Sequence, residues 1–330
     1  MIADGVAAAG GWLVDGVLGE PPVRWHPVAW FGTAMGALER RTYRDTRRAG
    51  AGHLAIGAGG AVLGGLALRR SVGGPGATLV ASTVCIAGRM LTGEVRAVVA
   101  LAAQDLPAAK ERLRGLVGRE ATALDADGVV RAAIESLAEN TVDAVTAPLV
   151  WATLGGAPAV LVHRAINTLD AMVGHRNDRY RNFGWAAARA DDVANWLPAR
   201  LTALAVVAVR PRRARAVATV VRRDARRHPS PNGGVIEGAF AAALGVRLGG
   251  TNVYGGVVED RGHLGDGPPP TVADGERAVS LARRTAAVVA LACAVLPVAV
   301  RRMRPRSPAG PGLSRRGRRG RRCGAGASGR

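Results

Sequence analysis

Three carboxylates recur every four residues in the segment ESLAENTVDAVTAPLVW, where Glu135, Glu139 and Asp143 come just before an apolar run. Each residue of an α-helix turns by about 100°, so the directions of these side chains drift by only about 40° per step and share one face. Like charges on one face repel unless they meet a cation or an arginine. The spacing, with Asn140 beside it, therefore predicts a binding or catalytic site. The alternative is a solvated helix face with partners such as Arg131 for Glu135.

A second polar segment, residues 163–200, mixes amides, carboxylates, arginines and aromatic rings. Carboxylates suit Mg²⁺, and arginine binds phosphate through two parallel hydrogen bonds. The candidate Mg²⁺ ligands are Asp170, Asp178, Asp191 and Asp192. The candidate phosphate clamps are Arg176, Arg179 and Arg181. The alternative is that these charges neutralise one another at a membrane surface. His163 lacks the spacing of a metal ligand and is expected to be a polar interfacial residue.

A third segment, HPSPNGG at residues 228–234, predicts a tight loop that opens a helix. Ser230 or Asn232 can cap this helix, Gly233 lets backbone N–H groups approach an anion, and Glu237 lies in the first turn. The loop predicts a phosphate site, with a capped turn that holds no ligand as the alternative. It is not a Walker motif, because GxxxxGK[ST] is absent from the chain.

Apolar segments must position these polar ones. Crossing about 30 Å of hydrocarbon takes roughly 20 helical residues. Residues 51–68 and 144–162 carry no formal charge, and weaker candidates lie at 71–88, 193–209, 285–300 and 1–19. The pattern predicts an all-α, polytopic integral membrane protein with five to six transmembrane helices, unless one or two weak candidates are buried core helices. Residues 1–304 would form one membrane-embedded domain, with polar helical loops at about 92–143, 163–192 and 211–284.

The net charge of +20 is concentrated at the C-terminus, where residues 301–330 carry eleven arginines and no acidic residue. Residues 305–330 have no apolar periodicity, which predicts a disordered Arg-rich tail. This tail lacks the interleaved aromatic residues of a nucleic-acid binder, so nucleic acid is not an expected partner. The other basic residues flank apolar segments, which favours membrane lipid. The three cysteines form no CxxC, so a structural zinc site is not supported.

Four motifs in order resemble one family. They are LGEPPVRWHPVAWFG at 18–32, ESLAENTVDAVTAPLVW at 135–151, NTLDAMVGHRNDRYRNFGWAAARADDVANWLPARLTAL at 167–204, and HPSPNGG followed by LGGTNVYGG and LGDG. Together they resemble the CobD or CbiB family of cobalamin biosynthesis, the membrane-bound adenosylcobinamide-phosphate synthases. The chain departs from the family's pattern at Val235 and Ile236, where an aromatic residue and proline are frequent, and at His175, where a tyrosine is frequent.

The resemblance implies amide formation between adenosylcobyric acid and aminopropanol or aminopropanol phosphate, driven by ATP with Mg²⁺. It implies a multi-pass protein of the cell (inner or plasma) membrane, with other cobamide-assembly enzymes as possible partners. A carboxylate must be activated before it acylates an amine, and the amine must lose a proton before it attacks. The alternative is a membrane transporter of an anionic metabolite, which should show repeated halves that the sequence lacks.

For this reaction the resemblance suggests roles for the residues already singled out. The first candidates for metal or proton are Glu135, Glu139 and Asp143, oriented by Asn140. The second candidates for metal are Asp191 and Asp192. The candidates for substrate phosphate are Arg176, Arg179 and Arg200, with a phosphate-binding turn formed by Ser230, Asn232 and Gly233.

Truncation after Arg304 is expected to leave membrane insertion and activity nearly intact, because the tail offers no core-forming residues and lies outside the family resemblance. The measurement compares membrane fractionation and product formation in the full and truncated chains. A loss of activity greater than about tenfold, or roughly 1.4 kcal/mol, would show that the tail takes part in catalysis.

Overall fold

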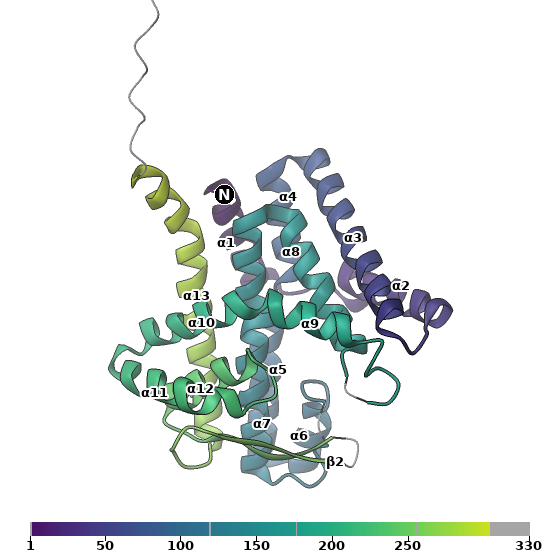
Figure 1. Ribbon diagram of the computed structural model, residues 1–330. Helices are drawn as coiled ribbons and strands as arrows, with labels where there is room; N and C mark the ends of the chain where they lie inside the picture. Colours follow the sequence, from purple (N-terminus) through teal and green to yellow (C-terminus); the bar gives the residue numbers. More distant parts are fainter. Residues whose placement is uncertain (1, 119, 176, 255–256, 304–330) are drawn as a thin grey trace, which may run out of the picture.

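The computed structural model describes residues 2–118, 120–175, 177–254 and 257–303 and is mostly helical (Figure 1). The predicted tail at 305–330 lies outside the described residues. The α-helices are α1 (Ile2–Leu18), α2 (Pro27–Thr42), α3 (Arg47–Val72), α4 (Gly74–Cys85), α5 (Gly88–Gln104), α6 (Leu106–Leu113), α7 (Ala126–Thr141), α8 (Ala147–Val173), α9 (Trp185–Ala194), α10 (Trp196–Val209), α11 (Ala214–Asp224), α12 (Gly233–Leu244) and α13 (Val272–Met303). Short 3-10 turns lie at Val23–Trp25, Pro211–Arg213 and Ala225–Arg227, and a π-helical turn η2 at Val142–Thr146 joins α7 to α8.

Within the part of the chain that the structure describes, three helical stretches are long and apolar enough to cross a membrane: Arg47–Val72, Ala126–Val173 and Val272–Leu296. A fourth arises if α9 and α10, which meet at an angle of 41°, form one broken span. The predicted number of five to six spans is therefore not confirmed. The weaker candidates at 1–19 and 71–88 form α1 and α4, of 17 and 12 residues. Helices this short fall at or below the usual range of about 17–25 residues for a transmembrane helix.

The long stretch Ala126–Val173 does not run straight, because the chain folds back at Gly156. This glycine has φ 66° and ψ −156° inside α8, and Pro158 follows it. Trp151 and His163 would lie about 18 Å apart on a straight helix. They nevertheless hydrogen bond the neighbouring residues Ala194 and Asn195. In Figure 1 the segment rises beside α1, turns at the top and descends towards α9.

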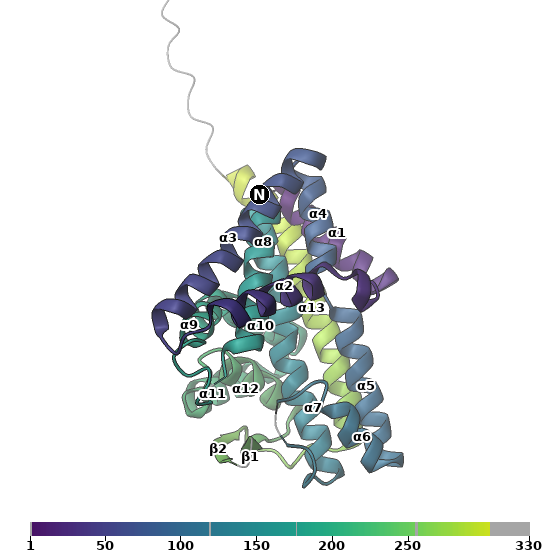
Figure 2. The same cartoon turned by 90° about the vertical axis from the view of Figure 1, so that its right-hand side faces the viewer.

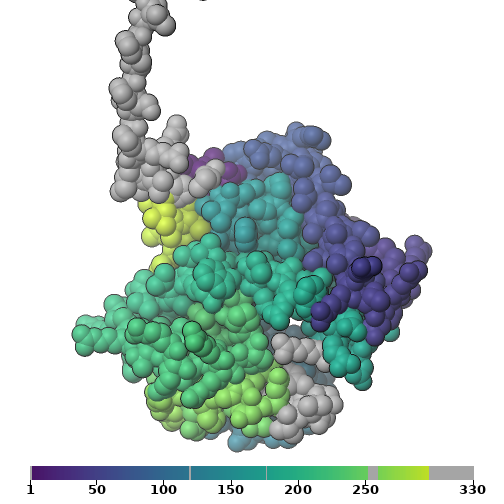
Figure 3. All heavy atoms as spheres, viewed as in Figure 1, coloured from purple at the N-terminus to yellow at the C-terminus, as the bar shows by residue number. Residues whose placement is uncertain are grey.

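The helices form two halves, seen most clearly by comparing Figures 1 and 2. One half contains α1, α3, α4 and α8, and the other contains α5, α6, α7, α11 and α12. The helix α13 runs along both halves and packs against α1, α5, α7 and α10. In the space-filling view the green surface of the second half lies below the blue and purple N-terminal helices (Figure 3). The centre of the second half is α12, all of whose residues are buried.

A β-hairpin corrects the all-α prediction. Strands β1 (Leu248–Tyr254) and β2 (Val257–Leu264) pair antiparallel, with Leu248 opposite Leu264 and a register shift between Gly249 and Thr251. The segment LGGTNVYGG is rich in glycine, and its composition does not predict a strand because glycine is depleted in strands. Here Gly249 and Gly250 have positive φ, and a Cβ on Gly249 would overlap the carbonyl oxygen of Gly262 across the hairpin. The glycines allow this irregular strand rather than preventing it.

Replacement of Gly156 by Ala is expected to lower the melting temperature of the detergent-solubilised protein. A side chain at this positive φ costs about 1–2 kcal/mol, and its Cβ would lie 3.1 Å from Thr78 Oγ1 and 3.2 Å from Asp4 Oδ1. The control is Gly60→Ala in α3, where nothing lies within 4 Å of the new Cβ. That change should be neutral or stabilising, since alanine is favoured over glycine in a helix by about 1 kcal/mol. Equal melting temperatures for the two variants would show that the chain does not reverse through a positive φ at Gly156.

Candidate functional site

The predicted carboxylate face of α7 exists, but its three members have different partners. Glu135 is only 5% exposed, and its Oε1 accepts a hydrogen bond of 2.7 Å from the backbone N–H of Gly249. Arg131 donates to the carbonyl of the same glycine. Both side chains therefore attach α7 to the hairpin, and the alternative of a solvated face does not hold for Glu135.

Glu139 lies one turn further on and faces a buried histidine and a second buried glutamate. Ligand atoms of Glu139, His228 and Glu237 all lie within 4.8 Å of one another. The three residues come from α7, from the loop before α12, and from the second turn of α12. Glu237 was expected in the first turn, but the helix begins only at Gly233.

His228 connects this triplet to the HPSPNGG loop. Its Nε2 lies 3.2 Å from Glu237 Oε1, and its Nδ1 accepts a hydrogen bond of 3.1 Å from the backbone N–H of Ser230. Burial lowers the pKa of His228 below its ordinary value of 6.5, because the charged imidazolium is poorly solvated there. The ring is therefore neutral at neutral pH and can act as a base or a metal ligand.

Asp143 belongs to a second polar cluster, formed because the fold-back places the two ends of α8 side by side. Asn167 hydrogen bonds Asp143 and also donates to Asp191 Oδ1 at 3.3 Å. Asn195 donates to Asp191 Oδ2 at 3.0 Å, and its own oxygen lies 2.9 Å from His163 Nε2. The π-helical turn re-aims Asp143 relative to Glu139, as such turns often do at functional sites.

The carboxylates of Asp170 and Asp192 extend this second cluster. Asp143 interacts electrostatically with Asp170, Asp191 and Glu139, and Asp170 interacts with Asp191 and Asp192. Oxygen donors concentrated in this way suit a hard divalent cation. The two clusters are thus neighbours at the junction of the two halves of the molecule.

The HPSPNGG loop is a capped turn rather than an open anion site. Ser230 Oγ accepts hydrogen bonds from the backbone N–H groups of Asn232 (3.3 Å) and Gly233 (3.0 Å). The side chain of Asn232 instead bridges two helices: it donates to the carbonyl of Asp192 and accepts from Arg200. Because its N–H groups already have acceptors, the turn supports the alternative of a cap that holds no ligand.

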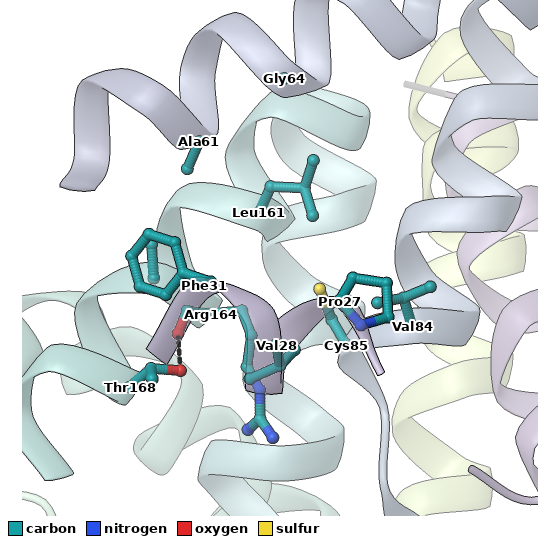
Figure 4. Close-up of a pocket in the computed structure, with 11 residues that line it drawn as sticks. Pro27, Val28, Phe31, Ala61, Gly64, Val84, Cys85, Leu161, Arg164 and Thr168 are labelled. Carbon is teal, nitrogen blue, oxygen red and sulfur yellow. Dashed lines mark hydrogen bonds between the residues drawn. The ribbon is translucent and has the colours of Figure 1, made fainter. Parts of the chain in front are cut away.

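An apolar pocket of about 440 Å³ borders the second cluster (Figure 4). Residues of α2, α3, α4 and α8 line it, among them Phe31, Cys85 and Leu161. Arg164 is its charged residue, and a guanidinium nitrogen of Arg164 lies 3.4 Å from Asn167 Oδ1. The pocket thus connects through Arg164 and Asn167 to the carboxylates.

Comparison with known proteins decides the family. A family described as CobD/Cbib protein matches residues 8–282. The chain belongs to the CobD/CbiB family. Cobalamin biosynthesis protein CobD of Mycobacterium tuberculosis is 48% identical over 303 residues, which cover 89% of this chain and 95% of that protein. The protein of the same name from Rhodobacter capsulatus is 41% identical over 298 residues, or 86% of this chain and 95% of that protein. No solved structure matches the chain.

Most of the predicted site residues of this CobD/CbiB chain meet near the junction of its two halves. Glu139 and Asp143 lie in the two clusters, Asp191 and Asp192 lie beside Asp143 and Asp170, and Arg200 contacts Asn232. Asn140 turns back along its own helix, where its amide donates to the carbonyl and hydroxyl of Ser136.

Arg179 is not part of these clusters. Arg179 forms an ion pair of 3.0 Å with Glu39 and lies over the rings of Tyr43 and Tyr180, so it fastens the loop after α8 to α2. Arg176 lies outside the described residues.

Sequence reasoning missed the roles of His228, Glu237, Asn195 and His163 in the CobD/CbiB fold. The sequence predicts only that His228 belongs to a turn and that Glu237 lies near the start of a helix. His163 is 2% exposed and bonded to Asn195, so it is an internal residue rather than an interfacial one. The sequence does contain one indication of their role: Glu237 is the only charged residue of the apolar segment 233–244, and His228 comes shortly before that segment.

Replacement of Asn195 by Ala is expected to lower the melting temperature, because the buried His163 Nε2 and Asp191 Oδ2 would each lose a partner. Each unsatisfied group costs about 1–3 kcal/mol. The control is Asn182→Ala, which removes a surface hydrogen bond of 3.0 Å to Asp45 and should cost about 0.5–1.5 kcal/mol. Similar shifts for both variants would show that the network around Asn195 is not stabilising.

Proposed function

We propose that this protein is a membrane-bound enzyme that joins adenosylcobyric acid to aminopropanol or aminopropanol phosphate through an amide bond, at the expense of ATP. Membership of the CobD/CbiB family supports a role in cobalamin biosynthesis. The proposal also places the chain as a multi-pass protein of the cell membrane, which the long apolar helices support.

The observation that carries the proposal is that six acidic residues, a neutral histidine and an apolar pocket lie in neighbouring parts of the molecule. Amide formation needs a base for the amine and compensation for phosphate charge. Glu139 and Asp143 are the candidates for either metal ligand or base, because Glu135 is bonded to the N–H of Gly249. Arg200 is the candidate for substrate phosphate, since its guanidinium reaches the HPSPNGG loop just before α12.

The donor set of the second cluster fits Mg²⁺. Asp143, Asp170 and Asp191 offer carboxylate oxygens, and Asn167 orients two of them. When bound there, Mg²⁺ would offset the charge of the ATP phosphates. The chain's own contribution is to hold the oxygens in place from α8, α9 and the π-helical turn, and to present a base next to them.

The direct test incubates the purified full chain in detergent with ATP, Mg²⁺, a corrinoid carboxylic acid and aminopropanol phosphate. Mass spectrometry should detect a product heavier by the amine minus one water, and only when ATP is present. Uptake of the corrinoid into sealed vesicles without any such product would instead favour the transporter.

Replacement of Glu139 by Gln is expected to reduce product formation by about 10²–10⁴, because the amide keeps the shape of the side chain but can neither accept the amine's proton nor carry the charge. The control is Glu111→Gln in α6, which breaks only an exposed ion pair with Arg114. Exposed pairs contribute about 0.2–1 kcal/mol, so this variant should fold and turn over nearly normally. If Glu139→Gln retained more than about a tenth of wild-type activity at saturating Mg²⁺, the residue would be structural, and Asp191 would be tested next.

A further inference from the structure

Glu139, His228 and Glu237 form a compact group whose charge is not balanced within the group itself. Glu237 is 2% exposed and His228 6% exposed, and the carboxyls of Glu139 and Glu237 lie within hydrogen-bonding distance of each other. Two carboxylates this close, away from water, cannot both ionise unless positive charge compensates them.

The imidazole ring points its free nitrogen at these carboxylates. Among the residues that the structure describes, Nε2 of His228 has no hydrogen-bond partner, although Glu237 Oε1 lies only 3.2 Å away. The carbonyl oxygen of Ser230 lies 3.3 Å from Nδ1. The contact with the Ser230 N–H and the contact with the Ser230 carbonyl belong to different tautomers of the ring. When Nδ1 accepts from the N–H of Ser230, Nε2–H faces Glu237 Oε1; when Nδ1–H donates to the carbonyl, Nε2 turns a lone pair towards the carboxylates, and a bound metal would select this second tautomer. A histidine that holds a metal is fixed in this way, with its other N–H on a backbone carbonyl.

The backbone at Gly233 approaches two of the three ligands closely. A Cβ on Gly233 would lie 2.7 Å from Glu139 Oε1 and 2.7 Å from His228 Cε1. Only glycine therefore fits between the end of α7 and the histidine. The ligands come from three separate elements, so the group closes only in the folded protein.

We propose that Glu139, His228 and Glu237 bind one divalent cation of the first transition series or zinc, at a site distinct from the aspartate cluster suited to Mg²⁺. One imidazole and two carboxylates suit Mn²⁺, Co²⁺ or Zn²⁺, whereas Mg²⁺ favours oxygen ligands and water. A cation of charge +2 matches the two carboxylates. Ligands of one such ion lie roughly 3–4 Å apart, which the present separations approach without a change of fold. Only the use of this ion in amide formation rests on the proposed function.

Arg261 offers the competing explanation. It interacts electrostatically with both Glu139 and His228, and its Nε also reaches Glu259 at 3.4 Å. If its guanidinium alone compensated the carboxylates, the group would hold no metal. The test therefore measures metal binding directly.

The test uses the purified full chain in detergent, stripped with a chelator and titrated with Co²⁺ alone. Visible absorption should show one Co²⁺ per chain with the bands of a site that contains a nitrogen ligand, and Zn²⁺ should displace it. The affinity should fall at least tenfold in His228→Gln and in Glu237→Gln. It should stay unchanged in Glu94→Gln, a matched change at an exposed pair with Arg112. Equal binding in all four proteins, or no bound Co²⁺ in the wild type at 1 mM, would overturn the proposal.

A second measurement needs no variant, in case the substituted chains do not fold. Pulsed EPR of Mn²⁺ bound to the wild-type chain should show coupling to an imidazole nitrogen, and a purely oxygen-ligated spectrum would overturn the proposal. No nucleotide or corrinoid is present in either experiment. A chain that binds Co²⁺ but forms no amide would refute the proposed function alone, and a chain that forms amide but binds no Co²⁺ would refute the site alone.

Discussion

Buried carboxylates need hydrogen-bond donors or positive charge, and this requirement organises the centre of the molecule. Glu135 accepts a hydrogen bond from the N–H of Gly249, and Asp191 accepts hydrogen bonds from the side-chain amides of Asn167 and Asn195. Asp224 takes the guanidinium of Arg223 and the N–H of Gly265. Asp191 lies near the junction of the two halves, so its hydrogen bonds to Asn167 and Asn195 also help to fix how the halves meet.

The fold-back of α8 brings polar partners to these buried carboxylates. It returns the chain to its starting level, which brings Asn167 to Asp143 although the two are far apart in sequence. Small residues make the close approach possible: a Cβ on Gly65 would overlap Pro158, just after the reversal, and a Cβ on Gly50 would overlap the carbonyl of Phe183. Helices that contain little more than Ala, Gly and Val can pack at such short distances, as is common in membranes.

Two groups with different potential ligands lie close together, because Glu139 belongs to one group and Asp143 to the other. Oxygen ligands gather around Asp143, Asp170 and Asp191, whereas the buried imidazole of His228 lies beside the carboxylates of Glu139 and Glu237. The family match ends at residue 282 and includes both groups. An apolar pocket lies next to the polar clusters, and Arg164 connects its lining to Asn167.

The sequence by itself determined the helical class, the apolar segments and the family. Helical periodicity is a local property, so the i, i+4 spacing places Glu135 and Glu139 on neighbouring turns of α7, whereas Asp143 lies in the π-helical turn that follows. The family followed from four motifs in order, because such motifs preserve residue identity over long stretches of chain.

Only the tertiary structure decided which partners these residues meet. Glu139 meets His228, and Asp143 meets Asn167, because a single positive φ at Gly156 reverses the chain and a π-helical turn re-aims one carboxylate. Neither event leaves a periodic signal in the sequence. The sequence does not predict the β-hairpin for the same reason. Gly249 packs against Gly262 across the hairpin and is bonded to Arg131 of α7, which is far away along the chain. Local pattern reports the direction of a side chain relative to its own helix, whereas the identity of its neighbour depends on packing between elements distant in sequence.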